Sequence, residues 1–162
     1  MWAHHSRKMH MLLNSFCMLD VAHCSPRTTV LEAAHLMRRH HTGDLVVVDD
    51  DDGGDDRMTP LGVITDRDIV VEVLAKGADP AHTLVSQVIH TPVVIANSHE
   101  DSSTVLERMR THGVRRIPVV GDDGVLVGIV TSDDMWKRLA ADAHMLTEIV
   151  NKEQNHEQRA RR

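Results

Sequence analysis

One seven-residue pattern occurs twice in the chain, as Gly62-Val-Ile-Thr65-Asp-Arg-Asp68 and as Gly128-Ile-Val-Thr131-Ser-Asp-Asp134. In each copy an apolar run typical of a strand comes first, and a helix-forming stretch follows. A hydroxyl and a carboxylate three residues apart are therefore expected at a strand-to-helix corner. The pattern predicts a small-ligand site at each corner.

The repetition extends upstream of this motif. Residues 37–48 align with residues 109–120 at an offset of 72 (109 − 37), and the offset falls to 66 (128 − 62) at the motif itself. The first copy therefore carries six extra residues, and the acidic stretch 49–56 accounts for them. Its Gly-Gly pair flanked by aspartates is turn chemistry, so we interpret the stretch as an insertion in a hairpin loop.

Composition limits the classes of partner. A chain of 162 residues can form one compact domain, or two small units that share a core. Aromatic residues make up 2%, which predicts an aliphatic and methionine-rich core and argues against base-stacking platforms. The net charge of −6, with 13 histidines counted as neutral, offers no basic footprint for a phosphate backbone. Nucleic acid is therefore not an expected partner.

The two cysteines and the N-terminal segment bear on the compartment. Cys17 and Cys24 cannot form a disulfide framework and are expected to be reduced thiols. Residues 9–19 place basic residues before an apolar patch, as a signal peptide does, but the patch is short and lacks a small-residue cleavage site. No run approaches the ~20 apolar residues that a membrane span needs. We expect a cytoplasmic protein without a membrane partner.

Apolar spacing predicts the same order of elements in both copies. In the first copy we expect an extended piece at 21–24, a helix at 29–41, strands at 45–48 and 61–65, and a helix at 66–76 that ends at Gly77. In the second copy we expect an extended piece at 93–96, a helix at 103–111, strands at 117–120 and 126–131 around a turn at 121–124, and then a helix. A short helix through 83–89 is expected to connect the copies.

The last helix is expected to run well beyond the second copy. Its apolar residues keep a three-to-four spacing: Trp136, Leu139, Ala143, Leu146 and Val150. This stripe can pack against the same chain or form a dimer contact. Beyond Asn151 the chain is polar and charged, and we expect it to fray.

With a doubled unit in which each motif follows an apolar hairpin, the chain resembles a tandem pair of cystathionine-β-synthase (CBS) domains, a Bateman module. The resemblance covers residues 21–139. It implies an α/β (α+β) fold of two β-α-β-β-α units packed as a pseudo-twofold pair, with an extended C-terminal helix. The domains expected are an N-terminal segment at 1–20, a first unit at 21–78, a connecting helix at 79–90, a second unit at 91–140, and a helix and tail at 141–162.

The resemblance also implies two clefts that bind adenosine-containing ligands such as AMP, ADP, ATP or S-adenosylmethionine. The family's threonine and aspartate correspond to Thr65 with Asp68 and to Thr131 with Asp134. By similarity the aspartate accepts hydrogen bonds from the ribose hydroxyls, and the threonine contacts the sugar or phosphate. An ionised carboxylate only accepts hydrogen bonds, so it suits a cis-diol with its two donors.

The remaining site residues are predicted by position in the repeat. The apolar walls of the second cleft are assigned to Val93, Ile95, Ile117 and Pro118, and those of the first to residues 21–23 with Leu45 and Val46. Candidate phosphate ligands are Arg67, Arg115 and Arg116, with helix N-termini behind the motifs. The first copy has Gly43-Asp44 where the second has Arg115-Arg116. If one cleft binds a phosphorylated nucleotide more tightly, we expect it to be the second.

Each of these interpretations has a structural alternative. Threonine and aspartate at such a corner are also ordinary helix N-cap residues. Duplication in a matching context favours the ligand interpretation over the cap. Arg115 and Arg116 can equally be solvated surface charges.

Metal and catalytic sites are not indicated. The adjacent pairs His4-His5 and His40-His41 lack the i, i+4 spacing that brings two rings to one ion on a helix. The acidic loop does not match an EF-hand, because Pro60 stands at the twelfth position counted from Asp49, where a bidentate glutamate is required. We find no Walker loop, nucleophile elbow or acid/base pair, so we expect neither a metal nor an enzyme.

The resulting hypothesis is a stand-alone regulatory module that senses an adenosine-containing ligand, forms a homodimer through its helices and transmits occupancy to an unidentified downstream protein. Coupling of this kind is worth ~1–3 kcal/mol. One alternative is a module of the same fold that has lost nucleotide binding and serves as a dimerisation or protein-interaction unit. Another is a metal- or redox-responsive protein that uses His23, Cys24 and neighbouring histidines.

Overall fold

The computed structural model describes residues 13, 17, 20–49 and 58–160. The chain divides into two compact units, Met1–Val130 and Thr131–Arg162. The first unit contains most of the repeat, and the second consists of the final helix.

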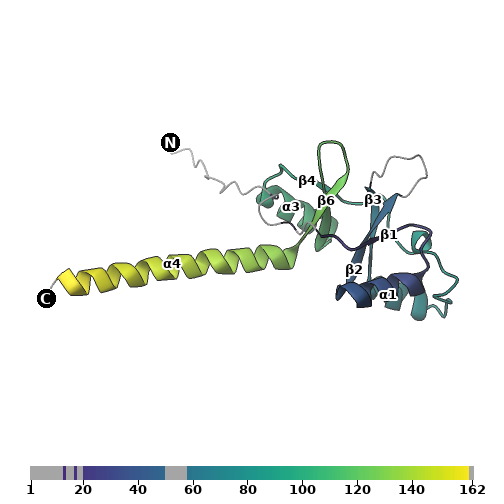
Figure 1. Cartoon of the computed structure of the whole chain (residues 1–162), viewed down its shortest axis with the longest axis horizontal. Helices are drawn as coiled ribbons and strands as arrows, with labels where there is room; N and C mark the ends of the chain where they lie inside the picture. Colours follow the sequence, from purple (N-terminus) through teal and green to yellow (C-terminus); the bar gives the residue numbers. More distant parts are fainter. Residues whose placement is uncertain (1–12, 14–16, 18–19, 50–57, 161–162) are drawn as a thin grey trace. The chain divides into compact units, whose positions relative to one another are not determined.

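The first copy of the repeat forms a three-stranded sheet covered by a helix (Figure 1). Its elements are β1 (His23–Cys24), α1 (Val30–His40), β2 (Asp44–Asp49) and β3 (Thr59–Thr65). Strand β1 pairs with β2 in parallel, and β2 pairs with β3 in antiparallel register. The helix begins at a capping box in which Thr29 and Glu32 exchange hydrogen bonds. Its apolar face packs on the sheet: Val30, Ala33 and Met37 share one cluster with Leu45, Val47 and Ile64.

The hairpin of the first copy agrees with the predicted insertion. Strands β2 and β3 are paired up to Asp49 and Thr59. The acidic stretch therefore connects two paired strands, as predicted, while residues 50–57 lie outside the described residues.

After β3 the chain turns into α2 (Asp66–Asp68) and continues as η2 (Ile69–Leu74). The helix predicted at 66–76 is confirmed in position, but η2 is a π-helix, in which the Ala75 N–H donates to the Val70 carbonyl at 2.9 Å. Apolar spacing does not distinguish this wider winding from an α-helix over so short a segment. Gly77 then adopts a φ of 69°, which glycine tolerates without strain, and ends the helix.

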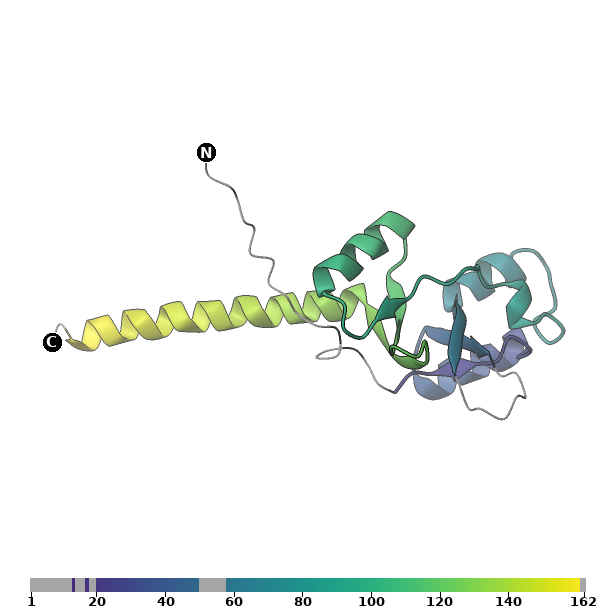
Figure 2. The same ribbon diagram turned by 90° about the horizontal axis from the view of Figure 1, so that it is seen from above.

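The connection between the copies is less helical than predicted. It contains only the short 3₁₀ turn η3 (Val85–Gln87) before the chain reaches the second copy (Figure 2, teal). Backbone groups of this connection form hydrogen bonds with the first copy. The Val30 N–H donates to the Thr83 carbonyl and the Val85 N–H to the Thr28 carbonyl, both at 2.9 Å. The helix expected at 83–89 was therefore wrong in extent.

The second copy repeats the first. It contains β4 (Ala96–Asn97), α3 (Ser102–His112), β5 (Arg116–Val120) and β6 (Leu126–Thr131), with sheet order β4-β5-β6 and β4 parallel to β5. The predicted strand 126–131 is confirmed. The extended piece predicted at 93–96 begins pairing only at Ala96, where the parallel register with β5 starts.

The two sheets meet through aliphatic side chains. Val46 and Val48 of β2 cluster with Leu126 and Ile129 of β6. The Leu126 N–H also donates to the Met58 carbonyl at 2.8 Å. The two β-α-β-β-α units thus form the packed pair that was predicted, with an aliphatic core.

The second compact unit is one continuous helix, α4 (Ser132–Ala160), of 29 residues (Figure 1, yellow-green to yellow). It continues past Asn151, so the expectation of fraying there was wrong. Lysine, glutamate, glutamine, arginine and alanine dominate residues 151–160, and all are strong helix formers. Among the described residues, none of the helices combines the length and apolar character that crossing a membrane requires.

Candidate functional site

The first motif folds into a closed corner at the end of β3. The Asp68 N–H donates to Thr65 Oγ1 at 3.2 Å. In return, Asp68 Oδ2 accepts from the Thr65 N–H at 2.8 Å and from its hydroxyl at 2.7 Å. The capping interpretation is therefore correct as geometry. Within the described part of the chain, Asp68 Oδ1 takes no hydrogen bond and remains available as an acceptor.

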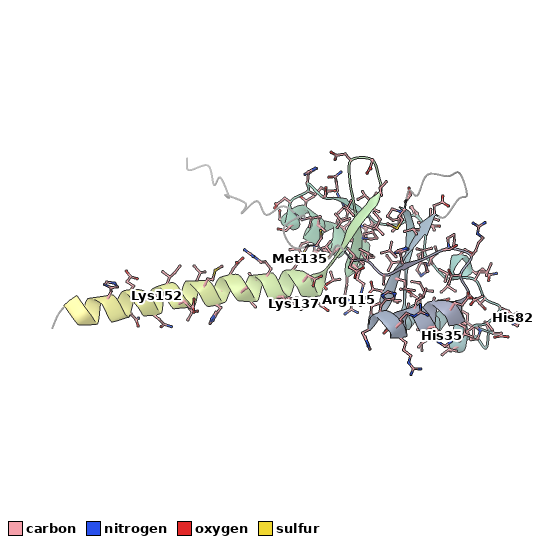
Figure 3. All side chains as sticks on the ribbon, in the orientation of Figure 1. His35, His82, Arg115, Met135, Lys137 and Lys152 are labelled. Atoms are coloured by element: carbon pink, nitrogen blue, oxygen red, sulfur yellow. The ribbon has the colours of Figure 1, made fainter. Side chains whose placement is uncertain are left out.

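The second motif adopts the same geometry. Asp134 Oδ2 accepts from the Thr131 N–H at 3.2 Å and from its hydroxyl at 2.7 Å. Here the other carboxylate oxygen, Oδ1, lies 3.7 Å from Lys137 Nζ. The lysine stands near the start of α4, and its repeat counterpart (137 − 66) is the apolar Val71 (Figure 3). The duplicated corners thus differ in the charge beside the aspartate.

A cavity of about 530 Å³ lies beside the first corner. This volume is within the range of small-molecule sites. The cavity joins the first motif to the segment before β4 and to the turn between α3 and β5. Its lining residues are Val63, Thr65, Asp66, Arg67, Asp68, His90, Pro92, Val93, Val94, His112, Gly113, Val114, Arg115 and Arg116.

The cavity combines residues that the sequence analysis had divided between two clefts. Val93 and the arginine pair had been grouped with Thr131 and Asp134, whereas the structure places them beside Thr65 and Asp68. The repeat offset identifies equivalent positions in the two copies, but it carries no information on which loop faces which corner. Val93, Arg115 and Arg116 thus line a cavity at the first corner, and their role in a second cleft stays a prediction.

Three other predicted wall residues lie outside this cavity's lining. Ile117 and Pro118 are buried in β5. Ile95 is 40% exposed, and its carbonyl oxygen accepts a hydrogen bond from Arg108 Nη1 at 2.6 Å. Of the predicted first-cleft positions, Leu45 and Val46 are fully buried. A ligand role for these residues stays a prediction.

Cationic side chains surround the first corner. Arg115 lies before β5 with an exposed side chain (Figure 3). Arg116 is part-buried, and its Nε lies 2.9 Å from Asp44 Oδ1, so it is not a freely solvated charge. Arg67 follows Asp66, whose carboxylate accepts from the Arg67 N–H at 2.7 Å. All three arginines line the cavity.

Sequence reasoning missed two histidines of the lining. His112 ends α3, and its Nδ1 donates to the Arg108 carbonyl at 2.9 Å. His90 lies in the segment between η3 and β4. In the sequence, the one indication that His112 belongs to this lining was its position three residues before Arg115.

Comparison with protein families decides the identity of the fold. The model of the CBS domain matches residues 14–75 and 85–135, which together make up most of the chain. This chain belongs to the CBS domain family. The match in two segments confirms the predicted tandem pair.

Relatives of this CBS pair come from several microorganisms. The "Uncharacterized protein MK0525" of Methanopyrus kandleri is 34% identical over 72% of this chain, and the match spans 56% of that protein's length. Hypoxic response protein 1 of Mycobacterium tuberculosis is 36% identical over 71% of this chain and 76% of its own.

Solved structures show the same fold. A crystal structure of Hypoxic Response Protein I "with two coordinated zinc ions" has a TM-score of 0.67 at 31% identity, covering 78% of this chain and 98% of its own. The CBS domain pair of protein MJ0100, in complex with 5′-methylthioadenosine and S-adenosylmethionine, has a TM-score of 0.70 at 23% identity, covering 82% and 98%.

The zinc in one related structure makes the metal question relevant to this CBS pair. Within the described residues, no group of three or more histidine, cysteine, aspartate or glutamate side chains is placed to hold a metal ion. Cys24 is buried in the core, and burial raises the pKa of its thiol to about 11. Such a thiol stays protonated at neutral pH and is a poor metal ligand and a poor redox centre. That no metal is required stays a prediction.

Proposed function

We propose that this CBS pair is a cytoplasmic, non-enzymatic regulatory module that binds an adenosine-containing ligand in the cavity beside Thr65 and Asp68. The observation that carries the proposal is the composition of that cavity. Its lining combines Asp68, whose Oδ1 is available as an acceptor, with apolar residues and three arginines. A ribose, a base and a phosphate group need these three surroundings.

Each part of the ligand has a matching surface. Asp68 Oδ1 accepts hydrogen bonds from the ribose hydroxyls, since an ionised carboxylate offers only acceptors. Pro92, Val93 and Val94 form the apolar wall for the adenine ring. Arg67 and Arg115 supply the donors for phosphate oxygens. The likeness to MJ0100 concerns the fold, so the ligand class is inferred from these residues.

The arginines also change the expected ranking of the two sites. They accompany the first motif, and not Thr131 and Asp134 as the repeat alignment suggested. We therefore assign the tighter phosphate-binding site to the cavity of Asp68. Asp134, with Lys137 beside its carboxylate, is assigned to the second and weaker adenosine site.

Regulation follows if the ligand prefers one arrangement of the two copies. Because the cavity is lined by residues of both copies, a bound ligand contacts both at once. A ligand can shift an equilibrium between arrangements only by its differential affinity for them. In this proposal a downstream protein responds to the change in the arrangement of the two copies.

Self-association through α4 is part of the proposal. Trp136, Leu139, Leu146 and Val150 are 69%, 58%, 65% and 49% exposed and keep the spacing of a coiled-coil seam. Helices α1 and α3 have 11 residues each, too few to cover a seam on a helix of 29 residues. The occupant that matches it in length and spacing is α4 of a second copy.

Light scattering tests the homodimer. The chain of 18.1 kDa is expected to run at about twice that mass, and Leu146→Asp is expected to make it monomeric. Asn151→Asp adds the same charge beside the seam and is expected to leave the dimer intact. A monomeric wild type would refute the homodimer without affecting the ligand proposal.

Ligand binding is tested by thermal-shift titration with AMP, ADP, ATP and S-adenosylmethionine. A ligand at a hundred times its dissociation constant adds about 2.7 kcal/mol to a protein that binds it only when folded. We expect this stabilisation in the wild type and its loss in Asp68→Ala.

Glu32→Ala is the matched control. Thr29 and Glu32 form the same type of capping box at the start of α1, and neither lines the cavity. This variant loses an equivalent helix cap but is expected to keep the full ligand shift. If none of the four compounds stabilises the wild type, the sensing function is wrong and the protein-interaction alternative replaces it.

A further inference from the structure

Asp44 and Arg116 occupy the same position in the two copies of the repeat, because 116 − 44 equals the upstream offset of 72. Asp44 is the first residue of β2, and Arg116 is the first residue of β5. The duplicated position thus carries opposite charges in the two copies. The structure brings these charges together, with Arg116 Nε 2.9 Å from Asp44 Oδ1.

This ion pair is more sheltered than the Arg110–Glu107 ion pair of α3. The side chains of Arg116 and Asp44 are 27% and 14% exposed, whereas those of Arg110 and Glu107 are 76% and 60% exposed. Exposed pairs hold their partners weakly, because water and salt screen them. The Asp44 carboxylate therefore restricts the orientation of the Arg116 side chain.

The contact uses one particular nitrogen of the guanidinium group. A guanidinium carries five N–H donors in a planar fork, and Nε supplies one of them. The remaining donors belong to the two terminal amino groups, which take no hydrogen bond within the described part of the chain. Arg116 also lines the cavity, whereas Asp44 does not appear among its described lining residues.

Backbone pairing keeps Asp44 at a set distance from the first corner. Asp44 is the register partner of Thr65 in the β2–β3 ladder. The preceding carbonyl, that of Gly43, accepts from the Asp66 N–H at 2.9 Å. Asp44 is therefore fixed relative to Thr65 and Asp68, and through Asp44 so is Arg116.

We propose that Asp44 is a positioning residue that holds the terminal amino groups of Arg116 toward the cavity, where they bind an anionic group, so that the site selects phosphorylated adenosine ligands over uncharged or cationic ones. The inference rests on the proposed function and names the ligand class of that site. A guanidinium fork matches the oxygens of a phosphate with two parallel hydrogen bonds. A cationic sulfonium such as that of S-adenosylmethionine would instead face three arginines, with only Asp66 and Asp68 as opposite charges in the lining.

The test compares adenosine with AMP by isothermal titration calorimetry on the full chain. The readout is the ratio of the two dissociation constants, because a general loss of structure weakens both ligands equally. We expect the wild type to prefer AMP and Asp44→Ala to lose about tenfold of that preference, with adenosine affinity unchanged.

Two further variants test the positioning role. Asp44→Asn keeps an oxygen atom at the position that faces Nε and is expected to retain most of the preference for AMP, and it remains informative if Asp44→Ala does not fold. Arg116→Lys is expected to lose the preference, because one ammonium group cannot bind Asp44 and present a fork to phosphate. Glu107→Ala removes an exposed ion pair of α3 outside the cavity and is expected to change nothing.

The outcomes separate the two proposals. A wild type that binds adenosine and AMP equally tightly overturns the inference and leaves the proposed function standing. Equal weakening of both ligands by Asp44→Ala also overturns it, because Asp44 would then act only on the fold. A wild type that binds neither compound overturns both.

Discussion

Asp68 and Asp134 accept the same two hydrogen bonds from their threonines, yet the surroundings of their free oxygens differ. Asp68 Oδ1 is unoccupied in the described part of the chain and stands beside a cavity with arginines in its lining. Asp134 Oδ1 has Lys137 3.7 Å away. Duplication has preserved the backbone of the corner, while residues outside the motif determine its charge. The motif alone therefore predicts a corner but not the ligand that the corner prefers.

The largest expected effect comes from exchanging the two aspartates for alanine separately. With AMP at a hundred times its dissociation constant, Asp68→Ala is expected to remove most of a ligand-induced stabilisation of about 2.7 kcal/mol. Asp134→Ala is expected to retain it, because the arginines lie with the first corner. Thermal unfolding with and without AMP measures both. Loss of the shift in Asp134→Ala alone would reverse our ranking of the two sites.

A glycine of the first corner provides the second comparison. A Cβ atom on Gly62 would lie 2.8 Å from Cδ1 of Ile89, a residue of the connection that follows the first copy. Gly62→Ala is therefore expected to lower the free energy of unfolding by about 2 kcal/mol through overpacking. Adding Ile89→Ala removes the clash, so chemical denaturation should show a smaller cost of Gly62→Ala in that background. Independent, additive costs would show that the contact does not limit this position.

The third comparison concerns an ion pair that only the second copy has. Arg108 and Glu100 form a two-point salt bridge, with N–O distances of 2.7 and 3.0 Å, where the first copy has Leu36 and Thr28. Burial alone would raise the pKa of Glu100, but hydrogen bonds from Arg108 and from the Asn97 N–H outweigh it, so the pKa is lowered.

A lowered pKa in the folded state means that the stabilisation is present above the ordinary carboxylate range and is lost as pH falls through the folded pKa. We expect acid to destabilise the wild type more than Glu100→Gln, by about 1.5 kcal/mol. Urea unfolding at pH 7 and in the acid range measures this difference. Parallel acid losses in the two proteins would contradict it.

The features that sequence predicted well are local. The spacing of apolar residues indicated strand 126–131 and a helix at 103–111, which the structure extends to Ser102–His112. Periodicity records which side of an element is buried, and that property is set within a few residues. The threonine–aspartate contact spans three residues, and a helix cap at this corner was named as the alternative to a ligand role.

The features that sequence did not predict depend on contacts between distant segments. The first copy was expected to bind phosphate less tightly because it has Gly43-Asp44 in place of Arg115-Arg116, and the structure shows Asp44 paired with Arg116. Val93 was likewise expected at the second corner, and the structure shows it in the lining of a cavity at the first. Side-chain pairing across 72 residues follows from how the two copies pack, which a repeat offset does not record.

The smallest expected effect concerns Cys24, whose counterpart in the second copy (24 + 72) is Ala96. Both residues are buried, at 5% and 1% exposure. The second copy therefore shows that alanine fits this core position. Cys24→Ala is expected to cost no more than about 1 kcal/mol in free energy of unfolding at pH 7.

Burial raises the thiol pKa of Cys24 from 9.0 to about 11, so as pH rises through that window the unfolded thiol ionises before the folded one. The wild type should therefore lose stability relative to Cys24→Ala between about pH 9 and 11, since stability from a raised pKa is lost as pH rises. Parallel stability curves for the two proteins over this window would show that the thiol is solvated, and would contradict the close equivalence of the two cores.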